Sequence, residues 1–153
     1  MESSLQIVTL LHILFATLWF AYSLGQSRMM KQFAGLDADQ WKVLLADVQR
    51  RTRMGLVMGI LTLGSGVGLI VLMGGMKNVS PAIHTALSVS LVMVALTFFG
   101  QGGIVRKLSE QLDGDSGTRL AGAKRYAMFT GLIHLGWLIN LSLMVFRHYW
   151  TVS

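Results

Sequence analysis

The sequence contains no cysteine and only one proline among its 153 residues. Without cysteine the chain forms no disulfide and offers no thiolate for catalysis or for metal binding. Charged side chains are also scarce, at 13% of the residues, whereas an ordinary soluble domain carries about 25%. Hydrophobic residues make up 53%. This composition indicates a membrane protein.

Acidic side chains are absent from every long apolar run. All seven lie in connecting segments or near the N-terminus: Glu2, Asp37, Asp39, Asp47, Glu110, Asp113 and Asp115. A di-iron site of the bundle type needs glutamates on the bundle helices, and a proton relay through a membrane uses buried Asp or Glu. The sequence therefore excludes both, together with catalysis by a buried pair of carboxylates.

Four apolar runs are present, at about residues 5–26, 54–76, 82–103 and 127–146. Each has about the 20 residues that a helix needs to cross the hydrocarbon core of a bilayer. The first run has no basic residue before it and no cleavage site after it, so we expect it to be retained. The prediction is an all-α membrane protein, with residues 1–153 forming a single transmembrane domain. Its simplest arrangement is an up-down-up-down four-helix bundle.

The basic residues are strongly biased to one side of the predicted membrane. Six lie in the 27–53 connection and five in the 104–125 connection, whereas the opposite side has only Lys77 and Arg147. Basic connections stay in the cytoplasm. We therefore expect a bacterial inner-membrane protein with both termini outside. Because topology accounts for the positive charge, we expect no nucleic-acid partner.

Residues 36–51 have the pattern of a short amphipathic helix between the first two spans. Asp37 or Asp39 can cap it, and we expect it to lie on the membrane surface or on the ends of the first two membrane helices. Its apolar face consists of Trp41, Leu44, Leu45 and Val48. After the second span, Ser80 followed by Pro81 is typical of a helix start.

Three histidines lie inside predicted membrane helices: His12, His84 and His134. Polar side chains at such depth tend to face the bundle interior, and imidazole nitrogens suit haem iron, copper and zinc. At about 1.5 Å per residue, the depth below the outer surface is about 10 Å for His12, 18 Å for His134 and 4 Å for His84. By depth alone His12 could pair with either of the other two, whereas His84 and His134 are too far apart to pair. We expect His134 to be the partner, because His84 lies nearest to the outer water. The alternative is that each histidine only hydrogen-bonds to a neighbouring helix.

Small and polar residues accompany these histidines. His12, Trp19 and Ser23 share one face of the first helix, which we expect to point inward. The second helix contains Gly64-Ser65-Gly66-Val67-Gly68. Small residues at this spacing let two helices approach closely, and glycine also permits close approach to a bound ligand. Under the second interpretation, Trp19, Gly64 and Gly68 line a pocket for a flat macrocycle.

Short motifs resemble the CopD/HemJ-like superfamily of four-helix membrane proteins. They are Leu11-His12 followed by Leu18-Trp19-Phe20-Ala21, the basic segment Arg50-Arg51-Thr52-Arg53-Met54, and Ala82-Ile83-His84. The resemblance implies a haem-binding protein that oxidises protoporphyrinogen, with His12 as the leading site residue, or a protein of copper uptake. The sequence departs from the HemJ pattern at Ala86, where a lysine is usual.

The sequence-based hypothesis is a b-type haem protein of the membrane, an oxidoreductase or electron-transfer component with His12 and His134 as axial ligands. A quinone or a redox protein would exchange electrons with it. Three alternatives stay open: protoporphyrinogen oxidation, copper transport, and a non-catalytic structural subunit whose histidines only pack. Assembly into a homo-oligomer is also left open.

Overall fold

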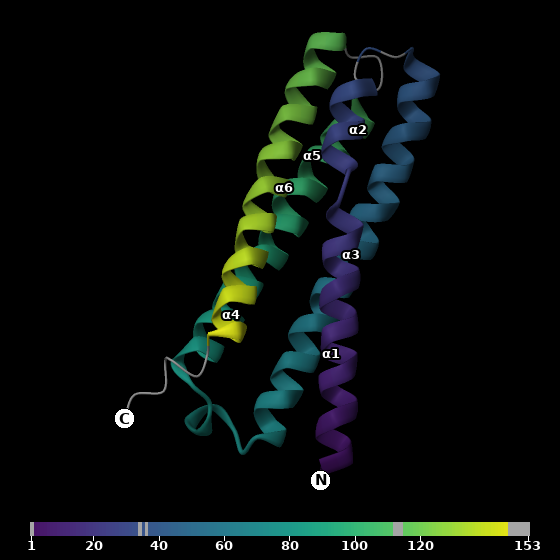
Figure 1. The fold of residues 1–153 in the computed structure, drawn as a ribbon. Helices are drawn as coiled ribbons and strands as arrows, with labels where there is room; N and C mark the ends of the chain where they lie inside the picture. The colour runs from purple at the N-terminus through teal and green to yellow at the C-terminus, as the bar shows by residue number, and fades with distance from the viewer. Residues whose placement is uncertain (1, 34, 36, 112–114, 147–153) are drawn as a thin grey trace.

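The computed structural model describes residues 2–33, 35, 37–111 and 115–146. It is an all-α bundle of four antiparallel helical rods, as predicted (Figure 1). The first rod consists of α1 (Glu2–Ser23) and α2 (Gln26–Phe33), and the second is α3 (Ala38–Leu72). After the 3-10 turn η1 (Met76–Asn78), the third rod comprises α4 (Pro81–Ala95), the π-helix η2 (Leu96–Gly102) and α5 (Gly103–Glu110), and the fourth is α6 (Ser116–Val145).

All four rods are long and apolar enough to cross a membrane, which makes the chain a multi-pass membrane protein. The start of α1 and the end of α6 lie at the same end of the bundle, and both basic connections lie at the other end (Figure 1). The 35 residues of α3 extend over about 52 Å at about 1.5 Å per residue. Since the hydrocarbon core is only about 30 Å thick, the bundle projects beyond it.

The expectation of a separate short helix at residues 36–51, between the first two spans, was wrong, whereas the expected packing on the ends of the membrane helices agrees with the structure. The structure makes 38–51 the first part of α3, capped by Asp37, whose side chain accepts a hydrogen bond from the backbone N–H of Gln40 at 2.8 Å. The predicted apolar face is confirmed, because Trp41, Leu45 and Val48 are buried. They are buried against other helices of the projecting part of the bundle.

The bundle has two apolar cores. The first, which we call the projecting core, lies at the end with the basic connections and consists of Met30, Trp41, Leu45, Val48, Val105, Leu108, Ala123 and Tyr126. The second, which we call the membrane core, is smaller and centres on Trp19, Met93 and Ile133. Burial from water stabilises the projecting core, at about 1.5–3 kcal/mol for each large side chain. Inside lipid that driving force is absent, and close packing and hydrogen bonds hold the helices together.

Two irregular segments lie between these cores. The first rod breaks at Leu24 and Gly25, where Gly25 has a positive φ of 76° that favours glycine. The third rod widens into η2, whose residues Thr97, Gly100 and Gln101 are buried. A π-helical turn inside an α-helix frequently marks a functional site. The two irregular segments therefore direct attention to the layer between the cores.

Candidate functional site: a polar pocket between the two cores

The layer between the cores contains a small pocket that is open at one side. Side chains from the end of α1, the start of α2, the middle of α3, η2 and α6 surround it. Its aromatic and apolar wall is formed by Trp19, Tyr22, Gly55 and Ile133, and its polar wall by Ser23, Gln26, Arg51, Thr52, Thr97 and Gln101. Drug-sized ligands occupy about 300–1,000 Å³. The interior of this pocket is far smaller and has room for about one water-sized group, so a ligand would insert one small polar group and keep the rest of its bulk at the mouth.

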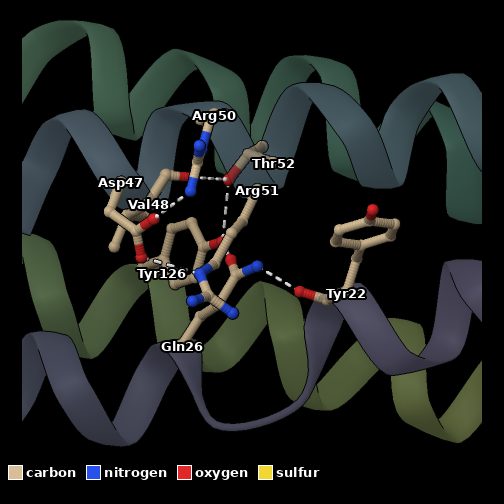
Figure 2. Close-up of polar contacts among 8 residues, drawn as sticks. All are labelled: Tyr22, Gln26, Asp47, Val48, Arg50, Arg51, Thr52 and Tyr126. Carbon is tan, nitrogen blue, oxygen red and sulfur yellow. Dashed lines mark hydrogen bonds and ion pairs between the residues drawn. The ribbon is translucent and has the colours of Figure 1, made fainter.

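A buried hydrogen-bond network fixes the pocket wall at the helix break (Figure 2). The phenol of Tyr126 donates to the side-chain oxygen of Gln26. The side-chain nitrogen of Gln26 in turn donates to the backbone carbonyl of Tyr22 in the last turn of α1. The hydroxyl of Thr52 lies 2.9 Å from the phenol oxygen of Tyr126. Three rods are thereby joined through the phenol of Tyr126, and its partner Gln26 is 2% exposed.

A second polar contact joins η2 to α6. The amide nitrogen of Gln101 donates to the hydroxyl of Thr130 at 2.8 Å, and that hydroxyl donates to the carbonyl of Tyr126 at 3.0 Å. Gln101 is 3% exposed and Thr130 is 2% exposed. A buried polar group without a partner destabilises a protein by several kcal/mol in lipid. The network therefore holds the irregular segment η2 in place.

One cationic side chain lines the pocket. Arg51 donates through Nε to the carboxylate of Asp47 at 2.7 Å, and Arg50 donates to the other oxygen of that carboxylate at 3.2 Å. Figure 2 shows Arg51 reaching from α3 toward the helix break at Gln26. An arginine side chain has five N–H donors, so the ion pair with Asp47 fixes its direction and leaves most of its donors for another partner.

The donors of the pocket set its chemistry. Besides the phenol of Tyr22, two amides, three aliphatic hydroxyls and a guanidinium group line it, and no carboxylate does. The hydroxyl hydrogens of Ser23, Thr52 and Thr97 are donated to backbone carbonyls of their own helices. The donors left for a ligand are therefore the second N–H of each glutamine amide and the remaining N–H groups of Arg51. The pocket is thus suited to a ligand that accepts hydrogen bonds at one end and contacts aromatic rings at the other.

His134 meets this pocket from behind. Its Nε2 lies 2.8 Å from the hydroxyl of Ser23, and the same hydroxyl donates to the carbonyl of Phe20 at 2.7 Å. Because serine has a single hydroxyl hydrogen, both contacts are satisfied only when Nε2 of His134 carries a hydrogen and donates it. Ser23 therefore connects the pocket wall to a histidine on the fourth rod.

His12 lies on the seam between α1 and α3. Its Nδ1 is 3.1 Å from the carbonyl of Thr62 and 3.0 Å from the hydroxyl of Ser65. A carbonyl only accepts, so Nδ1 is the donor, and Nε2 is the unprotonated nitrogen of the neutral ring. A Cβ added to Gly66 would stand 3.2 Å from Cε1 of the ring. The glycines here serve close packing of α1 on α3.

The structure does not bring the predicted histidine ligands together. His134 bonds to Ser23, which follows His12 by eleven residues on α1, or by about 16 Å along the helix. When two imidazoles bind one metal ion, their ligating nitrogens lie within about 4 Å of each other, because each metal–nitrogen bond is about 2 Å long. His84 is exposed and contacts the carbonyl of Met76 at 3.1 Å. The described residues contain no group of three or more acidic or histidine side chains that could hold a metal ion.

The other predicted site residues are also separated. Trp19 does line a pocket, but it packs on Gly59, where an added Cβ would stand 2.9 Å from Cε2 of the indole. Gly64 has open space at its Cβ position, and Gly68 faces Val8 at 3.8 Å. The expected pocket formed by Trp19, Gly64 and Gly68 is thus not assembled, and the α1–α3 seam is closed around His12. His148 lies outside the described residues.

Fold and site together define a multi-pass α-helical membrane protein with a polar interhelical pocket on the side of its basic connections. Comparison with known proteins does not assign the chain to a family, because no protein-family model, no curated protein and no solved structure matches it. The resemblance to the CopD/HemJ-like superfamily stays a prediction.

Proposed function

We propose that the protein is a membrane-integral binding protein that takes up a small hydrogen-bond-accepting ligand in the pocket at the α1–α2 break. The observation that carries the proposal is the set of six polar side chains lining this pocket with no carboxylate among them. The opposite wall of Trp19 and Tyr22 supplies aromatic surface, as ligand sites commonly do. This function belongs to the class of binding proteins rather than of redox enzymes.

Two irregular segments support this proposal. Backbone outside regular helices is tolerated at membrane depth where it is buried in protein or lines a cavity. Here both the break beside Gly25 and the π-helix η2 adjoin the same pocket. Buried side chains such as Gln101 and Thr130 also hold this layer.

We further propose that the pocket opens toward the cytoplasm of a bacterial cell, with the termini on the outer side of the inner membrane. The support is the bias of basic residues described above: eleven of the thirteen lie in the two connections at the pocket's end of the bundle. Short basic connections are retained in the cytoplasm.

The test compares two substitutions on one helix. Gly55 lines the pocket, and its Cβ position is 3.7 Å from Cβ of Tyr22, so Gly55→Leu places a side chain inside the space. Gly64→Leu is the matched control, because the Cβ position of Gly64 meets no atom within 4 Å. We expect native mass spectrometry of protein released from membranes to detect a small bound molecule on the wild type and on Gly64→Leu, and to find it missing from Gly55→Leu. A ligand retained by Gly55→Leu contradicts the proposal.

A second candidate function is the redox role predicted from the sequence, and one observation favours it. His12 donates Nδ1–H to a carbonyl, the arrangement that usually orients a metal-binding imidazole with its other nitrogen as the ligand. Haem iron bound there would supply one-electron chemistry. The paired arrangement of His12 with His134 does not fit, and the seam at Gly66 leaves no room for a macrocycle between α1 and α3.

The absorbance spectrum of the purified protein tests this candidate. A Soret band that His12→Ala removes and His84→Ala preserves would support haem ligation by His12 alone. A colourless protein that takes up no haem on reconstitution would remove this candidate and leave the binding function untouched.

A further inference from the structure

We infer that the ligand of the pocket is an oxyanion, a phosphate or carboxylate group, and that Arg51 is the residue that binds it. This inference rests on the proposed binding function and names the ligand class. The same chemistry is offered by a lipid head group in the adjacent leaflet and by a free anion in the aqueous phase, and the experiment below separates the two sources.

The position of Arg51 is the first support. It is the cationic member of the pocket lining, and its side chain is 44% exposed, whereas its neighbours Thr52 and Gln26 are buried. The guanidinium group thus stands where the pocket meets its surroundings. An anion that enters the pocket passes Arg51 before it reaches the buried amides.

The contact with Asp47 is the second support. This carboxylate accepts from Nε of Arg51, which leaves the two terminal nitrogens of the guanidinium to face another group. The edge formed by these two terminal nitrogens presents two N–H groups, which match the spacing of two oxygens on one phosphate or carboxylate. Asp47 is in this account a positioning residue, since it directs Arg51 without contacting the ligand.

The charge balance is the third support. Asp47 interacts with Arg50 as well as Arg51, so these three residues carry one net positive charge. The pocket wall adds only neutral donors, Gln26 and Gln101 among them. A cationic ligand would find no counter-charge in the lining, and a neutral ligand would leave the excess charge unused. An anion is the ligand class that the charges favour.

The experiment measures binding of two probes by calorimetry, with the protein in a neutral detergent. The probes are inorganic phosphate and dihexanoyl phosphatidic acid, a short-chain lipid. Arg51→Gln is compared with Arg53→Gln, which removes the same charge two residues along α3 from an exposed side chain outside the pocket lining. Arg51→Lys keeps the charge without the planar edge, and circular dichroism checks that each variant is folded.

We expect the wild type and Arg53→Gln to bind a probe equally well. Arg51→Gln should bind it at least about tenfold more weakly, as loss of a charged hydrogen bond predicts. The affinity of Arg51→Lys should lie between those of the wild type and Arg51→Gln. Binding of both probes indicates a free anion, and binding of the lipid alone indicates a head group. Equal weakening by Arg51→Gln and Arg53→Gln would overturn the inference, because it indicates attraction to surface charge only.

Failure of the inference is distinguishable from failure of the proposed function. If neither probe binds while Gly55→Leu still removes a molecule carried by the wild type, the pocket is a binding site and its ligand is not an oxyanion. If a probe binds Gly55→Leu as well as the wild type, its site lies outside the pocket, which overturns the assignment of Arg51 to this pocket.

Discussion

The hydroxyl of Ser23 accepts a hydrogen bond from Nε2 of His134, which joins the first and fourth rods at a point where the pocket wall ends. The two atoms are 2.8 Å apart, and the hydroxyl of Ser23 donates its own hydrogen bond to the carbonyl of Phe20. His134 is thus engaged about 16 Å from His12, by the rise of an α-helix. This contact separates the two histidines that the sequence pattern favoured as a pair.

Removing that contact gives the first prediction. We expect Ser23→Ala to lower the free energy of unfolding by about 0.5–1.5 kcal/mol, the range measured for hydrogen bonds between membrane helices. Unfolding in mixed micelles of a mild detergent and dodecyl sulfate measures it. Thr17→Ala is the control, since the exposed Thr17 hydroxyl bonds only to the carbonyl of Ile13 on its own helix. Equal effects of the two substitutions would show that the Ser23–His134 contact contributes nothing.

The second prediction concerns Tyr126. Its phenol bonds to Gln26 and Thr52 inside the protein, and its ring is fully buried. Tyr126→Phe leaves the buried side-chain oxygen of Gln26 without this donor, while Thr52 keeps its bond to the carbonyl of Val48. We expect a loss of about 1–3 kcal/mol in the free energy of unfolding. Tyr22→Phe is the matched control, because the network uses the backbone carbonyl of Tyr22 (Figure 2). A Tyr126→Phe protein as stable as the control would contradict the role given to the network.

Glycine packing gives the third prediction. A methyl group at Gly59 would stand 2.9 Å from Cε2 of Trp19 and 3.1 Å from Cγ2 of Val94, and Trp19 is itself buried. We expect Gly59→Ala to destabilise the protein by about 1–3 kcal/mol, as overpacking does. Gly64→Ala meets open space and should be neutral or stabilising by up to about 1 kcal/mol, since alanine favours helix. Unfolding in the same mixed micelles measures both variants. A Gly59→Ala protein more stable than Gly64→Ala would refute the packing of α1 on α3.

The fourth prediction concerns pH and the start of α6. The hydrogen bonds of Thr118 to Asp115 lower the pKa of that carboxyl. A pKa that is lower in the folded state than in the unfolded state stabilises the protein above the unfolded-state value, and the contribution disappears as pH falls through the folded-state value. Asp115→Asn still caps the helix, so we expect its melting temperature to equal that of the wild type near pH 3. Toward pH 6 we expect the melting temperature of the wild type to rise more than that of Asp115→Asn. If the melting temperatures of both proteins changed equally with pH across that range, the charge of Asp115 would contribute nothing to stability.

Much of the fold could be predicted from the sequence, because bilayer thickness and backbone hydrogen bonding leave few choices for four 20-residue apolar runs. The buried face at Trp41, Leu45 and Val48 was also predicted. Its location was not, since an amphipathic helix has the same pattern whether it lies on a membrane or in a protein core. Only the contacts with residues such as Val105 and Tyr126, distant in sequence, decide between the two.

The site was harder to predict for a related reason. The sequence placed Ser23 and Trp19 on one inward face of the first helix, and both do line the pocket. The partners of these side chains come from η2 and α6. The local sequence pattern around Gln101 does not predict a π-helix. The histidines were predicted as ligands because imidazole nitrogens bind metal ions. Their hydrogen bonds to carbonyls and hydroxyls depend on which helices adjoin, and the sequence does not give that arrangement.

The most direct test of the central claim, that the space beside Gly55 is a ligand site open on the side of the basic connections, uses the absence of cysteine from the chain. Gly55→Cys places a thiol in the pocket at ordinary contact distances, 3.7 Å from Tyr22 and 4.0 Å from Trp19 at its Cβ, and Gly64→Cys places one in open space on the same helix. The measurement is the rate at which a charged, membrane-impermeant thiol reagent modifies each variant in sealed vesicles of either orientation. The account predicts that Gly55→Cys reacts only from the side of the basic connections, that phosphate or phosphatidic acid slows this reaction, and that Gly64→Cys is unreactive from both sides. Gly55→Cys reacting no faster than Gly64→Cys, or only from the opposite side, would contradict it.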